Sequence, residues 1–260
     1  MKGAVYYNAM EAERNQTFIE DLQKESEQIG IQLVLITEPP TDSFDFILFR
    51  DRNPKLANEL EQTGYHLFNR SAVQEIANDK MRTFELASLL GIPTVPTYRL
   101  DQQLPELPLV LKTRGGYGGK EVFLCHTHKE VDEVLRGYER KELIAQPFIE
   151  AEAQDVRVFM LGENVVGAVK RTGSNSFKSN FTLGGSVEKY VLDETQTKQV
   201  QTIAQAIHSD YIGIDFLLPT KGSWLLNEIE DPVGARSLYV THDFSVAEKL
   251  MCYVKERLEK

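Results

Sequence analysis

Residues 108–125 read PLVLKTRGGYGGKEVFLC, and this stretch carries the strongest local signal in the chain. Two apolar runs typical of strands flank a loop with four glycines in five positions: Gly115, Gly116, Gly118 and Gly119. Glycines let the backbone approach a ligand closely and point several N–H groups at an anion. Lys112, on the strand that leads into the loop, can pair with a phosphate. The pattern predicts a phosphate-binding loop, with a flexible hairpin tip as the alternative.

The loop differs from the two common glycine-rich nucleotide motifs. A Walker A sequence needs Gly at position 114 and Ser or Thr at position 121, where this chain has Arg114 and Glu121. The dinucleotide fingerprint needs a helix directly after the glycines, but residues 121–125 (EVFLC) have the pattern of a strand. The glycines are therefore expected between two strands of one sheet.

The chain before this loop alternates apolar runs with a helical segment. Residues 3–7, 31–36 and 44–49 have the near-continuous apolar character of strands covered on both faces. Residues 11–29 repeat apolar positions with helical periodicity. Strand–helix–strand order with short links implies a right-handed parallel unit. We therefore expect an α/β domain of the doubly wound kind over residues 1–76.

The chain after the loop has an antiparallel pattern. From residue 155 onward, apolar strands follow one another through short polar links, as in the pair 211–218 and 223–230. This order predicts an α+β module that starts at residue 77. We divide it into a small glycine-loop subdomain at about 77–149 and a large subdomain at about 150–260.

Three carboxylates in the last predicted strands point to a metal site. Glu228 and Glu230 are two residues apart, so their side chains share one face of the strand. Asp215 interrupts an otherwise apolar strand, and antiparallel pairing can bring it beside the two glutamates. Clustered carboxylates repel one another unless a cation neutralises them, and oxygen ligands without His or Cys select Mg²⁺ or Mn²⁺. The alternative is an exposed acidic sheet edge.

Several basic residues are candidates for binding an anion. Most Lys and Arg side chains in an acidic protein are solvated, but Arg157 and Arg171 interrupt or end apolar strands. Such arginines can bind a carboxylate or a phosphoryl group through two parallel hydrogen bonds. The candidates are Lys80, Lys112, Arg157, Arg171, Lys178 and Arg236.

Composition limits the classes of partner. Hydrophobic residues make up 42% of the 260 residues, which is too many for a disordered chain. The net charge of −10 disfavours general binding to nucleic acid or to anionic membranes. There is no apolar run of the ~20 residues that span a bilayer and no signal-peptide pattern, and two cysteines fit free thiols. We expect a cytoplasmic protein without nucleic-acid or membrane partners, and the oligomeric state is not readable.

Together these motifs resemble the ATP-grasp superfamily and, within it, the RimK-like carboxylate–amine ligases. Residues 1–68 resemble the α/β domain that precedes ATP-grasp modules. The segments that match in order and spacing are 69–71, 79–80, 91–97, 111–119, 146–149, 155–157, 168–171, 177–180, 184–185, 213–215 and 227–232.

The resemblance implies that two subdomains hold ATP between them. Lys80 and Lys112 would contact phosphates beneath the glycine loop, and Asp155 would approach the ribose. In the adenine hinge, the Pro147 carbonyl would accept a hydrogen bond and the Phe148 N–H would donate one. The remaining residues implied for the nucleotide are Gln146, Ile149, Lys178 and Asn180, and those implied for Mg²⁺ are Asp215, Glu228 and Glu230.

The implied activity is an ATP-dependent ligase that joins a carboxylate to an amine through an acyl phosphate. Mg²⁺, Lys112 and Arg171 would supply the catalytic charge, and the partners would be an amino acid or peptide and an amine. The chain departs from the family where Glu230 replaces the usual Asn and Lys178 replaces an Arg. Alternatives are another ligase branch of the superfamily, an ATP-binding sensor without ligase activity, and a structural protein with an acidic patch.

Overall fold

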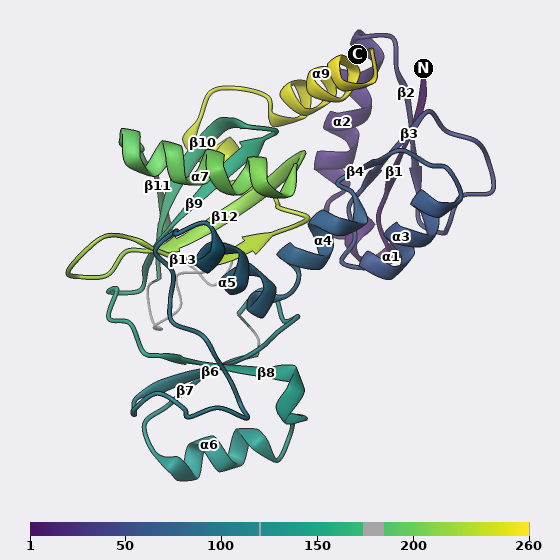
Figure 1. Cartoon of the computed structure of the whole chain (residues 1–260). Helices are drawn as coiled ribbons and strands as arrows, with labels where there is room; N and C mark the ends of the chain where they lie inside the picture. Colours follow the sequence, from purple (N-terminus) through teal and green to yellow (C-terminus); the bar gives the residue numbers. More distant parts are fainter. Residues whose placement is uncertain (120, 174–184, 260) are drawn as a thin grey trace.

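The residues that the structure describes form three β-sheets, with helices around them (Figure 1). The structure is a computed structural model and describes residues 1–119, 121–173 and 185–259. The first sheet is parallel and the other two are antiparallel, which confirms the expected order of an α/β unit followed by an α+β module. Within the described ranges, no helix is long and apolar enough to cross a membrane.

The N-terminal sheet has the parallel strand order β2-β1-β3-β4. Every residue of β3 is buried, as its apolar sequence FILF predicts. The helix expected over 11–29 is interrupted at Asn15, which ends one helix and precedes the next. The elements are β1 (Lys2–Tyr6), α1 (Ala9–Arg14), α2 (Gln16–Gln28), β2 (Gln32–Ile36), β3 (Phe46–Phe49), α3 (Pro54–Gln62) and β4 (Leu67–Phe68).

Two helices lead from this sheet into the small antiparallel sheet, whose strand order is β5-β8-β6-β7. Asp79 begins the second helix, because its carboxylate accepts hydrogen bonds from the N–H groups of Met81 and Arg82. The glycine loop joins β6 to β7, as expected. The elements are α4 (Ser71–Ala77), α5 (Lys80–Leu89), β5 (Tyr98–Arg99), β6 (Leu109–Thr113), β7 (Val122–Cys125), α6 (His128–Leu135), η1 (Arg140–Glu142) and β8 (Leu143–Pro147).

The large antiparallel sheet has the order β11-β10-β9-β12-β13. A short polar link of the expected kind joins the strands on either side of Gly162, which has the positive φ of 56° that favours glycine. The elements are β9 (Gln154–Leu161), β10 (Asn164–Thr172), β11 (Ser186–Lys189), α7 (Glu194–Ile207), β12 (Tyr211–Leu217), β13 (Leu225–Glu230), α8 (Arg236–Thr241) and α9 (Val246–Leu258).

The hydrophobic cores do not follow the three sheets one to one. One core combines Leu22 and Leu33 of the N-terminal unit with Leu250 and Met251 of α9. Figure 1 shows α9 beside α2, whereas the small sheet and α6 lie apart at the other end of the molecule. The small sheet has a core of its own, which includes Leu111. The N-terminal unit is therefore joined to the large sheet by shared packing, and the domain limits at 76 and 149 stay predictions.

Candidate functional site

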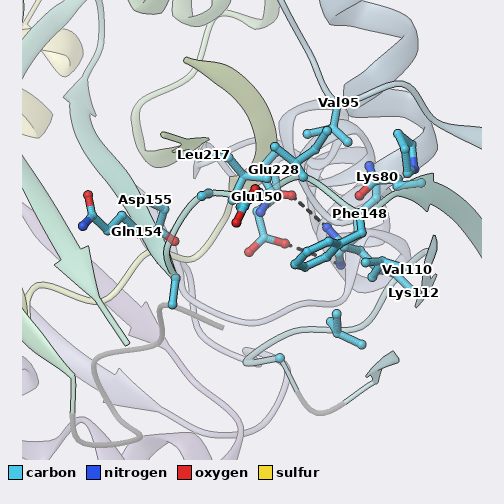
Figure 2. Close-up of a pocket in the computed structure, with 18 of the residues that line it drawn as sticks. Lys80, Val95, Val110, Lys112, Phe148, Glu150, Gln154, Asp155, Leu217 and Glu228 are labelled. Atoms are coloured by element: carbon cyan, nitrogen blue, oxygen red, sulfur yellow. Dashed lines mark hydrogen bonds and ion pairs between the residues drawn. The ribbon is translucent and has the colours of Figure 1, made fainter. Parts of the chain in front are cut away.

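A cavity of about 420 Å³ lies between the small sheet and the large sheet. Lys112 from β6 and Lys80 from α5 lie on one side of it, and Gln154 and Asp155 from β9 lie on the other (Figure 2). Glu228 of β13 lies between these two sides. The sheet topology thus brings together side chains that are far apart in the sequence.

Two buried lysines form the positive end of the cavity. The Lys112 side chain donates to Asn227 Oδ1 at 2.8 Å, and Lys80 Nζ lies 3.6 Å from Glu228 Oε2 and donates to the Gly116 carbonyl. Burial lowers the pKa of Lys112 to about 8, with Glu228 opposing this shift and Lys80 adding to it. Two ammonium groups beside one partly exposed carboxylate leave positive charge that favours an anion.

The conformation of the glycine loop requires glycine at three of its four glycine positions. Gly118 and Gly119 have φ values of 66° and 70°, where other residues are strained. A Cβ atom on Gly116 would collide with the side chains of Thr113 and Glu121, but one on Gly115 would meet only a backbone oxygen at 3.7 Å. The loop therefore needs glycine for its conformation, in addition to any need for close approach to a ligand.

An ion pair connects the base of this loop to the helix that carries Lys80. The Arg114 guanidinium donates to both carboxylate oxygens of Asp79, at 3.1 and 2.5 Å. The same carboxylate caps α5, so it holds the start of that helix and the loop together. Although burial opposes it, hydrogen bonding from Arg114 leaves the pKa of Asp79 below its ordinary value.

The predicted adenine hinge lines the cavity together with the apolar side chains of Val95, Val110 and Leu217. The Phe148 N–H, the predicted donor, already donates to the Pro108 carbonyl at 3.1 Å and so continues the pairing of β8 with β6. Within the described residues, the Ile149 N–H has no hydrogen bond to the protein. Its availability makes it the better candidate donor.

Gln146 is held behind the hinge. It is 4% exposed, and its side-chain amide donates to Thr97 Oγ1 at 2.8 Å. Thr97 in turn donates to the Val95 carbonyl at 2.9 Å. The structure therefore connects Gln146 to the segment that leads into β5, and the amide also lines the cavity.

A network of arginines and carboxylates covers one face of the large sheet. Arg157 Nε and Nη2 each donate to Asp215 at 2.7 Å, and Arg171 binds Asp155 in the same bidentate way at 2.6 and 2.7 Å. Arg171 also donates to Asp215 at 2.7 Å, and Arg157 forms a further ion pair with Glu230. The bidentate geometry expected of these arginines is confirmed, but their partners are carboxylates of the protein itself.

Asp215 and the two arginines of this network keep their charges at ordinary pH values. Burial alone would raise the pKa of Asp215, but Arg157 and Arg171 outweigh it and lower the pKa to about 2. Burial likewise opposes the charge on Arg171, yet Asp215 and Asp155 hold its pKa well above the ordinary value. Positive and negative charges therefore stabilise one another deep in the sheet.

The three predicted metal ligands are only partly brought together. Asp215 and Glu228 are opposite each other across β12 and β13, as the antiparallel link predicted. Only Glu228 lines the cavity, and among the described residues no three His, Cys, Asp or Glu side chains are grouped to hold a metal ion. Convergence of the three carboxylates is therefore not observed, because Arg157 and Arg171 neutralise Asp215 instead.

The chemistry of this donor set nevertheless fits a divalent cation. The three side chains offer only oxygen, which is what Mg²⁺ prefers. The guanidinium of Arg157 already bridges Asp215 and Glu230, so a cationic group is stable between two of the three. We therefore retain Asp215, Glu228 and Glu230 as predicted ligands.

The other predicted site residues differ in their placement. Asp155 and Arg171 line the cavity, although each is paired with the other. Arg236 is not among the residues of the cavity and donates to the Arg14 carbonyl. Lys178 and Asn180 lie outside the described residues.

Three side chains without a predicted role contact predicted site residues. Arg52 lies 3.3 Å from Glu230 Oε1, and nothing in its surroundings in the sequence distinguishes it from a surface arginine. Asn227 and Thr97 contact Lys112 and Gln146. Both belong to segments that match the family, 91–97 and 227–232, and this match could have identified them as site residues.

A cavity with two lysines between antiparallel sheets, preceded by a parallel sheet, defines an ATP-grasp fold. The crystal structure of the D-cycloserine synthetase DcsG matches with a TM-score of 0.78 and 16% identity, over 99% of this chain and 100% of that one. Residues 88–254 match the RimK-like ATP-grasp domain, and the chain belongs to that family.

Two relatives by sequence extend this result. The uncharacterized protein MG011 of Mycoplasma genitalium is 30% identical over 246 residues, which cover 90% of this chain and 85% of the relative. A probable alpha-L-glutamate ligase of Shewanella amazonensis is 28% identical over 214 residues, which cover 77% of this chain and 71% of the relative. The family is therefore one of ATP-grasp ligases, and the N-terminal unit is included in the similarity to MG011.

Proposed function

We propose that the protein is an ATP-dependent ligase that forms an amide bond between a carboxylate and an amine. The observation that carries this proposal is the cavity with Lys80 and Lys112 at one end and the segment 146–149 along its wall. Its positive end suits a triphosphate, and its apolar wall with free backbone polar groups suits a base. ATP is the ligand that satisfies both ends together.

The phosphates would bind at the lysine end. Lys112 and Lys80 are each at most 9% exposed, so their charges act with little screening by water. The backbone N–H groups of the glycine loop would close over the same phosphates. Loss of one ammonium group should therefore weaken ATP binding directly.

Adenine would bind against the hinge. The Pro147 carbonyl would accept from the exocyclic amine, and the Ile149 N–H would donate to the ring in place of the Phe148 N–H, which the protein itself uses. Val95, Val110 and Leu217 would contact the faces of the base. The proposed donor is therefore one residue further along the chain than Phe148.

Glu228, Asp215 and Glu230 would hold Mg²⁺, with Glu228 nearest the cavity. Bound Mg²⁺ supplies positive charge to the phosphate oxygens during transfer. Arg171, on the same face of the sheet, would add fixed positive charge, and Asp155 with Asp215 would keep its guanidinium oriented.

The reaction would proceed in two balanced steps. A substrate carboxylate oxygen attacks the γ-phosphorus of ATP, the bond to the ADP oxygen breaks, and an acyl phosphate forms. The amine then attacks the acyl carbon, phosphate leaves, and the amine loses a proton to give the amide. The protein acts by positioning the reactants and neutralising their charge, so it needs no covalent nucleophile.

The acidic substrate is proposed to be an amino acid. One relative carries the name probable alpha-L-glutamate ligase, and this makes L-glutamate the first amino acid to test, both as the carboxylate and as the amine.

The direct test measures phosphate release from MgATP. L-Glutamate and a panel of amino acids, dipeptides and small polycarboxylates would be supplied with and without a panel of amines, and products would be identified by mass spectrometry. We expect phosphate release that requires both a carboxylate and an amine, together with a product mass reduced by one water. Tight ATP binding with no phosphate release from any mixture would instead favour the sensor alternative and would contradict the ligase.

A further inference from the structure

Arg52 connects three parts of the molecule that are separate in the sequence. Its guanidinium lies 4.3 Å from the centre of the Tyr117 ring in the glycine loop. One of its nitrogens, Nη2, lies 3.3 Å from both Glu230 Oε1 and the Pro232 carbonyl. A single side chain of the N-terminal unit therefore touches the glycine loop and the end of β13.

The base of this side chain is held firmly. Arg52 follows β3, and its N–H donates to Asp51 Oδ1 at 2.8 Å. The same oxygen accepts from the Asn8 amide at 2.9 Å, and the Gln74 amide donates to the Asp51 carbonyl at 2.8 Å. Three elements of the chain thus fix the backbone from which Arg52 extends.

The glycine loop presents Tyr117 to this side chain. Tyr117 is 47% exposed, yet it also lines the cavity. A guanidinium over an aromatic ring is attractive at this distance, because the ring face carries negative charge. Arg52 is therefore placed to hold the tip of the loop against the N-terminal unit.

We propose that Arg52 is a positioning residue that holds the glycine loop over the bound nucleotide by stacking on Tyr117. The inference rests on the proposed function, since it requires a nucleotide in the cavity. The N-terminal unit would then help to set the rate of nucleotide release. Arg52 does not line the cavity itself and would act through Tyr117, which does.

The test is a double-mutant cycle on nucleotide dissociation. A fluorescent N-methylanthraniloyl derivative of the non-hydrolysable analogue AMP-PNP would be bound with Mg²⁺ and displaced by excess unlabelled analogue in a stopped-flow instrument. We expect Arg52→Gln and Tyr117→Leu each to raise the dissociation rate roughly two- to fivefold. The double variant should dissociate no faster than either single variant, because both remove one contact.

Two conservative variants separate this contact from a general loss of structure. Arg52→Lys retains a cation and Tyr117→Phe retains the ring. The nucleotide dissociation rate of Arg52→Lys should therefore lie closer to that of the wild type than the rate of Arg52→Gln does, and Tyr117→Phe should compare with Tyr117→Leu in the same way. Thermal unfolding of all variants would be compared in the absence of nucleotide, and Tyr117→Leu should unfold as the wild type does because the ring is half exposed.

The outcomes distinguish the two proposals. Unchanged dissociation in both single variants, or effects that multiply in the double variant, would overturn the role of Arg52 and leave ATP binding intact. Failure of the wild type to bind the labelled nucleotide, checked with unlabelled MgATP by calorimetry, would overturn the proposed function and this inference with it.

Discussion

The two walls of the cavity are built in different ways. On the large sheet, Asp155 and Arg171 line the cavity, and paired hydrogen bonds of 2.6–2.7 Å bind them into one network with Arg157 and Asp215, which do not line it. The other wall consists of backbone and apolar side chains of the small sheet, with Lys112 from β6 and Lys80 from α5, whose charges are less completely paired. The first wall has its electrostatic partners within the protein, whereas the second awaits some from a ligand.

This difference indicates a division of labour. A network fixed by buried ion pairs can keep charges oriented without change during a reaction, as transition-state stabilisation requires. A wall with two incompletely neutralised ammonium groups gains most when an anionic ligand binds. We therefore expect substitutions on the large sheet to affect folding most, and those on the small sheet to affect nucleotide affinity.

The largest effect should come from Asp215→Asn. This change leaves two buried guanidinium groups without their shared carboxylate, which should lower the free energy of unfolding by about 3–5 kcal/mol. Chemical denaturation measures it. Glu228→Gln is the matched control on the same sheet face, because its partly exposed side chain should cost at most about 1 kcal/mol. Equal losses in the two variants would contradict the stabilising role of the buried ion-pair network around Asp215.

Lys112→Ala should reduce ATP affinity with little loss of stability. A charged hydrogen bond to phosphate contributes about 1.5–3 kcal/mol, so binding should weaken roughly 10- to 150-fold. Isothermal titration calorimetry with MgATP measures this change. Unaltered affinity would remove Lys112 from the phosphate site, and a collapse of stability would place it with the residues of the large sheet.

The lowered pKa of Lys112 gives ATP affinity and stability opposite dependences on pH. Because its pKa in the folded protein is about 8, raising the pH above 8 removes its charge and should weaken ATP binding by up to about tenfold per unit. The ligand-free protein should gain stability over the same window, from pH 8 towards 10.5, as the cost of burying the ammonium disappears. Calorimetry and denaturation at pH 7, 8 and 9 would check both slopes.

Lys112→Ala serves as the control for this titration. Its weaker affinity should be nearly independent of pH over the same range. A variant that keeps the full pH slope would assign the titration to another group.

The smallest effect is expected for Thr97→Val behind the hinge. The change keeps the side-chain shape but removes the acceptor of the Gln146 amide, at a cost of about 1 kcal/mol in the free energy of unfolding. ATP affinity should fall no more than a few-fold. A loss of ATP affinity as large as that of Lys112→Ala would mean that binding of the base depends on the Thr97–Gln146 hydrogen bond as strongly as binding of the phosphates depends on Lys112.

Much of the fold could be predicted from local sequence patterns. The strand–loop–strand order around the glycines, the turn at Gly162 and the opposition of Asp215 and Glu228 all follow from spacing, because each depends on residues close together in sequence. The break at Asn15 was missed, since the apolar periodicity continues across it.

The partners of charged side chains could not be predicted in the same way. Arg157 and Asp215 are far apart in sequence and meet only because β9 and β12 are neighbours in the sheet. Spacing identified three carboxylates but not the guanidinium groups that neutralise them. Likewise, which N–H of the hinge is available depends on the pairing of its backbone. The Phe148 N–H is used by the carbonyl of Pro108, which directly precedes β6 and is 40 residues away in the sequence.

The core shared by the first sheet and α9 has a consequence for how the protein is made. The ribosome releases α2 and β2 long before it completes α9, so the surface formed by Leu22 and Leu33 lacks its cover, including Leu250 and Met251, throughout synthesis. The core that the first sheet shares with α9 can therefore be completed only after translation has reached that helix. Until then, the nascent chain displays an apolar surface that is suited to capture by a chaperone.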